Sequence, residues 1–153
     1  GVNALWFTTP SRGLAACADG QVYATENAGR TWIPRAASGG GEPLRAIFLA
    51  DADAGWVVGD GGAILRTMDG GATWKEIRLG GAVSIRRVWF TDRQRGWIVG
   101  ERGLLMKSWD GGETWVPEKA PVAADFLGMC FASPDAGWIV GDRGVILHYG
   151  RAR

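Results

Sequence analysis

The chain has 153 residues, which is enough for one ordinary domain with a hydrophobic core. Charged residues make up 22% of it and the formal net charge is +1, so nothing in the composition favours nucleic acid or an anionic membrane as a partner. No apolar run approaches the roughly 18–20 residues of a membrane-spanning helix, so direct membrane insertion is not expected either.

Two short phrases recur along the chain. The first occupies residues 25–32, 67–74 and 108–115, about 41 residues apart, and reads Ser/Thr-x-Asp/Asn-x-Gly-x-Thr-Trp. The second occupies residues 55–59, 96–100 and 137–141 and reads Gly-Trp-Val/Ile-Val-Gly. A fixed period of this length indicates a repeat architecture. Because a repeated phrase serves packing, function should be sought where the copies differ.

The repeats divide the single domain 1–153 into four units, 2–43, 44–83, 84–124 and 125–153. In the second unit, apolar runs bounded by Gly, Asp and Ser predict strands over 45–49, 55–58, 63–67 and 72–77. No segment shows helical periodicity over ten or more residues. Four short antiparallel strands in about 40 residues are typical of a β-propeller blade, so we predict an all-β chain of four blade-like units.

The turns and the tryptophans fit this prediction. Gly-flanked pairs at 59–62, 100–103 and 141–144 join the second and third strands, where a tight turn needs a positive φ. The acidic residue of the first phrase can accept hydrogen bonds from turn amides. Eight of the nine tryptophans fall at repeat positions and are interpreted as core residues: Trp6, Trp32, Trp56, Trp74, Trp89, Trp97, Trp115 and Trp138.

Together the phrases resemble the BNR or Asp-box repeat, and in their fuller form the photosystem II assembly and stability factor family, which includes many bacterial relatives outside photosynthesis. The resemblance covers essentially the whole chain. It implies a non-enzymatic protein-binding scaffold that acts on membrane-protein precursors, and export to a periplasm or thylakoid lumen. The structural Asp-box positions are Thr25, Asn27, Gly29, Trp32, Thr67, Asp69, Gly71, Trp74, Ser108, Asp110, Gly112 and Trp115.

The fourth unit reaches a third strand over 145–149 but shows no fourth strand. We therefore expect the last unit to lack its outer strand and the ring to be incomplete within this chain. The chain would then be part of a longer propeller, or a second copy would complete the ring as a homodimer.

Sorting the charges by strand order predicts a basic surface on one face of the propeller. Arg45, Arg86 and Arg87 open the innermost strands, and Arg102 and Arg143 lie in the turns on the same side. Such a surface suits a protein partner with an acidic surface or segment. The alternative is ordinary solvated charge, partly paired with Asp60, Glu101 and Asp142. Trp109 occupies a free position of the third phrase, where it is either an exposed partner contact or packed on a neighbouring turn.

The remaining signals argue against catalysis and bound metals. Cys17 and Cys130 do not have metal-ligand spacing and are consistent with two buried free thiols or with a disulfide between the first and last units. His148 is the only histidine, so no metal site and no cofactor is expected.

A sialidase-like glycosidase or glycan-binding propeller is the alternative function, but Tyr23 and Tyr149 both fall on third strands, away from the axis of the propeller. A structural repeat fragment without a specific partner is a further alternative.

Overall fold

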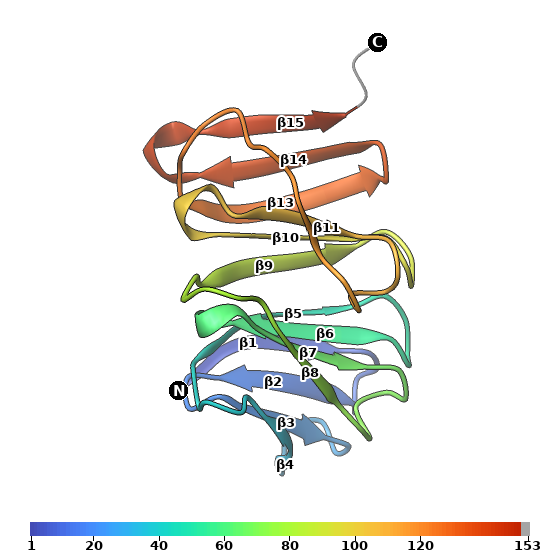
Figure 1. Ribbon diagram of the computed structural model, residues 1–153. Coiled ribbons are helices and arrows are strands. Elements are labelled where there is room, and N and C mark those ends of the chain that lie inside the picture. The colour runs from blue at the N-terminus through green and yellow to red at the C-terminus, as the bar shows by residue number, and fades with distance from the viewer. Residues whose placement is uncertain (151–153) are drawn as a thin grey trace.

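The computed structural model describes residues 1–150, which form four antiparallel sheets (Figure 1). The first sheet contains β1 (Val2–Phe7), β2 (Gly13–Cys17), β3 (Gln21–Thr25) and β4 (Ile33–Ala37). The second contains β5 (Leu44–Leu49), β6 (Gly55–Gly59), β7 (Ala63–Thr67) and β8 (Lys75–Arg78). The third contains β9 (Ile85–Phe90), β10 (Gly96–Gly100), β11 (Leu105–Ser108) and β12 (Val116–Pro117). The fourth contains β13 (Phe126–Ser133), β14 (Ala136–Gly141) and β15 (Ile146–Gly150).

The sheets stack in chain order through their first strands. β1 packs against β5, β5 against β9 and β9 against β13, and the first and fourth sheets lie at opposite ends of the stack (Figure 1). The prediction of an all-β partial propeller, with four blade-like units of which the last has three strands in the described part of the chain, is confirmed. No helix in residues 1–150 is long and apolar enough to cross a membrane.

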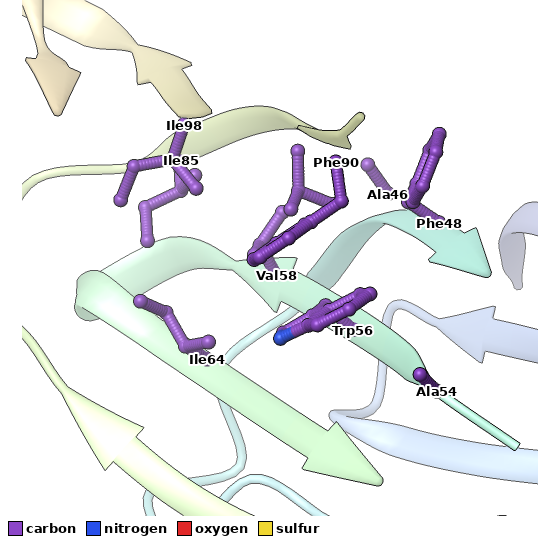
Figure 2. Close-up of a cluster of buried hydrophobic side chains, with 10 residues drawn as sticks. Ala46, Phe48, Ala54, Trp56, Val58, Ile64, Ile85, Phe90 and Ile98 are labelled. Atoms are coloured by element: carbon purple, nitrogen blue, oxygen red, sulfur yellow. The ribbon is translucent and has the colours of Figure 1, made fainter. Parts of the chain in front are cut away.

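The repeated Gly-Trp-Val/Ile-Val-Gly phrase forms the second strand of its sheet and is buried on both faces. In β6, Trp56 and Val58 face the third sheet and Val57 faces the first, because side chains alternate along a strand. Every residue of β6 and of β10 is buried. Figure 2 shows Trp56 of β6 against Phe90 of β9 within the core between the second and third sheets.

The fourth sheet has one face that no further sheet covers within residues 1–150. Trp138, Val140 and Ile146 are 43%, 41% and 71% exposed, although Trp56 and Trp97 at the matching position are fully buried. Trp138 is therefore not a core residue, contrary to the prediction for the repeat tryptophans, and five others are half-buried.

Cys130 pairs with Trp138 in register and is also exposed, so the expectation of two buried thiols holds only for Cys17. Both cysteines are free.

The eight-residue phrases close the turns between the third and fourth strands. In the second sheet, the Thr67 hydroxyl accepts the N–H of Gly71 at 2.9 Å and donates to Asp69 at 2.8 Å. Asp69 also accepts the backbone N–H of Thr73 at 2.8 Å. These donors, with the Thr73 hydroxyl first, lower the pKa of Asp69 to about 2. The predicted strand over 72–77 therefore begins only at Lys75, because the residues before it belong to this turn.

The other two turns repeat the arrangement with small changes. Ser108 and Asp110 take the places of threonine and aspartate in the third sheet, and the pKa of Asp110 is lowered to about 2, first by the hydroxyl of Thr114. In the first sheet, Asn27 accepts the N–H of Thr31 at 2.9 Å. The uncharged amide of Asn27 thus accepts the same turn hydrogen bond as the carboxylate of Asp69.

Short 3-10 turns join the second and third strands: η1 (Asp60–Gly62), η2 (Glu101–Gly103) and η3 (Asp142–Gly144). Their middle residues lie in the left-handed region, with φ of 65° at Gly61, 55° at Arg102 and 54° at Arg143. The sequence predicts that these Gly-flanked turns supply a positive φ, and Gly62, Gly103 and Gly144 have one. In two of the turns an arginine shares this role, although the left-handed region costs a side chain about 1 kcal/mol.

Candidate protein-binding surface

The five predicted arginines lie at one end of the sheets, the turn end, where η1, η2 and η3 gather (Figure 1). Arg45 lies near the start of β5, and Arg86 and Arg87 near the start of β9. Arg102 and Arg143 are the middle residues of η2 and η3. The first strand of each sheet begins at this end. Side chains from different repeats therefore come together there.

Three of the five arginines pair with the acidic residue that opens a turn. Arg45 pairs with Asp60, and Arg86 takes the same position in the third sheet with Glu101. Donation by Arg45 holds the pKa of Asp60 below its usual range. At the last turn, Arg143 pairs with the neighbouring Asp142 at 3.1 Å. The predicted pairing with turn carboxylates is therefore present, and it neutralises much of the charge that the sequence places here.

Arg87 and Arg102 carry the positive charge that these pairs leave over. Arg87 is exposed and donates to the carbonyl of Arg86 at 2.7 Å. Arg102 is exposed and donates to the carbonyl of Ala82 at 3.0 Å, and its backbone N–H bonds Asp125 at 2.8 Å. Neither guanidinium forms an ion pair within residues 1–150. Both belong to the third sheet or its turn, beside the carboxylate of Asp125, so two guanidinium groups face one carboxylate there and the remaining positive charge is modest.

Trp109 lies at the opposite end of the sheets, the Asp-box end, and so does not join the arginines. It is 55% exposed. The Nζ atom of Lys107 lies 4.2 Å from the centre of its ring, and the same atom contacts Tyr149 at 2.6 Å and Glu118 at 3.0 Å. The indole is thus held by a cation–π contact rather than buried under a neighbouring turn.

A cavity of about 510 Å³ opens at the Asp-box end, between the first and second sheets. Its walls include Trp6, Phe7, Leu14, Leu49 and the turn at Gly70. The charged side chains that line it are Arg12, Glu26, Arg35, Asp51, Asp53 and Asp69. The volume lies within the range of about 300–1,000 Å³ typical of ligand sites. Residues 1–150 contain no cluster of three or more side chains that could hold a metal ion.

Our sequence prediction did not include this cavity, although the sequence contains a signal for it. At the position of Trp56, Trp97 and Trp138 the first unit has Leu14, and at the position of Arg66, Lys107 and His148 it has Ala24. Both smaller residues line the cavity. The sequence shows these exchanges, but not that the two positions lie side by side across an interface.

The model of the photosynthesis system II assembly factor YCF48 family matches residues 2–84, 39–116 and 82–150. The chain belongs to this family. A comparison with curated protein sequences finds no match.

Three solved structures show the same fold. YCF48 from Cyanidioschyzon merolae superposes with a TM-score of 0.76 at 21% identity, over 98% of this chain and 51% of that one. The chain thus spans about half the length of that relative. The computationally designed Ika4 protein gives a TM-score of 0.81 at 11% identity, over 99% and 92%. The GH74 xyloglucanase from Xanthomonas campestris gives 0.73 at 19% identity, over 95% and 27%. At these identities the likeness extends to the fold alone.

Proposed function

We propose that this chain is a non-enzymatic scaffold that binds a segment of a client protein at its turn end, in the manner of an assembly factor for a membrane-protein complex. Membership of the YCF48 family supports this role. The observation that carries the proposal is the pair Arg87 and Arg102, two exposed guanidinium groups on the third sheet without an ion-pair partner in residues 1–150. An acidic segment, or a free C-terminal carboxylate, would satisfy their fork of donors. In a phototroph the client would be a photosystem II precursor.

The test is binding of acidic client peptides to variants that change the charge of this surface. Arg87→Glu with Arg102→Glu should weaken binding at least about tenfold and reduce its salt dependence. Arg30→Glu with Arg95→Glu serves as the charge-matched control and should bind normally, because both arginines are exposed at the Asp-box end and neither lines the cavity there. Equal binding by both variants would remove the turn end as the client surface.

Membership of an assembly-factor family favours a non-enzymatic role, whereas the fold alone is compatible with an enzyme. A GH74 enzyme shares the fold, which keeps a glycosidase as the second candidate. Against this candidate, Tyr149 lies on β15, the third strand of the last sheet, and not on the innermost strands, where such an active site is expected. Xyloglucan and a fluorogenic sialoside are the substrates to assay, and turnover of either above a heat-treated control would overturn the scaffold proposal.

We further propose that two copies associate through their terminal sheets. Trp56 and Trp97 are each covered by a phenylalanine of the next sheet, Phe90 and Phe131. At the two ends of the stack, Trp138 and Phe7 occupy the same positions, and each is 43% exposed. Phe7 of one copy can therefore cover Trp138 of another, and two such contacts would close an eight-bladed ring.

Light scattering coupled to size exclusion measures this association directly. A dimer that Trp138→Asp converts to monomer is the expected result. A monomeric parent chain at concentrations of about 100 μM would contradict it.

A further inference from the structure

The interface between the second and third sheets shows how a tryptophan fits between two blades. Trp56 stacks on Phe90 with ring centroids 3.5 Å apart and planes 7° apart, and its indole N–H donates to the carbonyl of Gly111 at 2.9 Å. Arg66 and Glu113 pair across the same interface. Together these four side chains fill the space beside the Asp-box turn, and Trp56 is fully buried.

The interface between the first and second sheets has a smaller residue at all four positions. Leu14 replaces the tryptophan and Leu49 replaces the phenylalanine, as their strand registers show. Ala24 replaces the arginine, and Ala72, at the same place in its turn, replaces the glutamate. All four line the 510 Å³ cavity, so the cavity is the volume that these truncations leave open.

The hydrogen-bond acceptor of the buried tryptophan is retained at the first interface. Gly70 holds the place in its turn that Gly111 holds in the next one. Gly111 is buried beneath Trp56, whereas Gly70 is exposed and lines the cavity. Within residues 1–150 the carbonyl of Gly70 accepts no hydrogen bond. An indole N–H is the donor that this position receives one repeat later.

The charges around the cavity favour one kind of residue next to a bound tryptophan in the same polypeptide segment. Glu26, Asp51, Asp53 and Asp69 line the cavity with Arg12 and Arg35. Arg93 pairs with Asp51 at 2.5 Å and with Asp53 at 3.4 Å, and Arg12 pairs with Glu26 at 3.3 Å. Four carboxylates thus face three guanidinium groups. The pKa of Asp69 is about 2, so the surplus negative charge persists at neutral pH and favours a cationic neighbour.

We propose that this cavity binds a tryptophan side chain carried by a polypeptide segment, with a lysine or arginine beside it. The indole occupies the volume that Trp56 fills one repeat later, packs between Leu14 and Leu49 beside Trp6, and donates its N–H to the carbonyl of Gly70. Because the site lies at the Asp-box end, it is separate from the arginine surface of the turn end. The scaffold would therefore hold a client at two places, or hold two different segments.

Calorimetric titration with blocked dipeptide amides tests the site. Acetyl-Trp-Lys-amide should bind about two- to fivefold more tightly than acetyl-Trp-Glu-amide, because the surrounding charge is exposed and its effect modest. Acetyl-Leu-Lys-amide should bind at least about tenfold more weakly, since it lacks both the ring and the N–H donor. Free L-tryptophan distinguishes a small-molecule site, and binding as tight as that of the lysine dipeptide would overturn the polypeptide assignment.

Leu14→Trp supplies the missing indole from the chain itself and should abolish binding of acetyl-Trp-Lys-amide. Leu5→Trp adds the same side chain at an exposed position of β1 outside the cavity lining, and should leave binding unchanged. Ala24→Arg with Ala72→Glu rebuilds the Arg66–Glu113 pair and blocks the cavity by a second route, which guards against misfolding of a single variant. Undiminished binding by folded Leu14→Trp and by the rebuilt pair would exclude this cavity. Leu14→Trp should still bind the acidic client peptides at the turn end, and Arg87→Glu with Arg102→Glu should still bind acetyl-Trp-Lys-amide. The two proposals can therefore fail separately.

Discussion

Trp56 and Phe90 stack in parallel across the interface between the second and third sheets, although 34 positions of sequence separate them and neither belongs to the other's sheet. Both are buried, and the indole N–H is bonded to the next turn. Removing the indole leaves a large cavity and an unsatisfied carbonyl. Trp56→Ala should therefore lower the free energy of unfolding by about 3–5 kcal/mol, measured by urea denaturation. Trp109→Ala, the exposed comparison, should cost less than about 1 kcal/mol, and equal losses would contradict the assignment of Trp56 to the core.

Gly100 lies where the second strand enters η2, and a Cβ atom there would meet the backbone oxygen of Ser84 at 2.1 Å. That oxygen belongs to the backbone and cannot rotate away. Gly100→Ala should lower the free energy of unfolding by about 2–3 kcal/mol. Gly80→Ala provides the matched control, because a Cβ there meets nothing within 4 Å, and it should change stability by less than about 0.5 kcal/mol. An unchanged stability of Gly100→Ala would show that the end of β10 can move away from Ser84, the residue before β9.

Asp69 and Asp110 make stability depend on acid pH. Their pKa values are lowered to about 2 in the folded chain, whereas an unfolded aspartate titrates near about 3.9. The folded state therefore binds fewer protons, so the stabilisation is present above about pH 4 and is lost as the pH falls toward 2. Asp69→Asn with Asp110→Asn should flatten the fall in urea midpoint across that interval. A double variant with the wild-type slope would show that other carboxylates cause the acid sensitivity.

Arg143 has a left-handed backbone in an exposed turn, where its only side-chain partner within residues 1–150 is the adjacent Asp142. Glycine adopts this conformation without the clash of a Cβ atom. Arg143→Gly should therefore leave stability unchanged or raise it by up to about 1 kcal/mol, despite the greater entropy of the unfolded chain. Arg143→Val, with a branched Cβ, should lower it by a similar amount. Thermal unfolding of the pair gives the comparison, and a Val variant as stable as the Gly variant would mean that the turn relaxes.

The strands and their order could be read from the sequence because each depends on local chemistry. The Gly-Trp-Val/Ile-Val-Gly phrase at 55–59 predicts a strand buried on both faces, and β6 is one. The Asp-box phrase predicts a turn fixed by its acidic residue, and Asp69 fixes it. Strand ends were less accurate, as at Lys75, because turn and strand share the same apolar residues.

The surface at the turn end was only partly predictable. Strand order placed Arg45, Arg86 and Arg87 together, since it depends only on which end of a sheet each strand begins. Which of them keep a free charge depended on rotamers and on neighbouring turns. Arg86 pairs with Glu101, whereas Arg87, one residue later, points to the opposite side of the strand and has no ion-pair partner in the described part of the chain.

The sequence by itself thus determined the repeat, the blade-like sheets and their turns, because periodicity, turn chemistry and hydrophobic alternation act over a few residues. Only the tertiary structure decided what the differences between repeats mean. Leu14, Ala24, Leu49 and Ala72 are separate small residues in the sequence, and they form one cavity because stacking brings the second strand of one sheet against the first strand and turn of the next. Packing between sheets depends on volumes summed across an interface, and that sum exists only once the sheets are stacked.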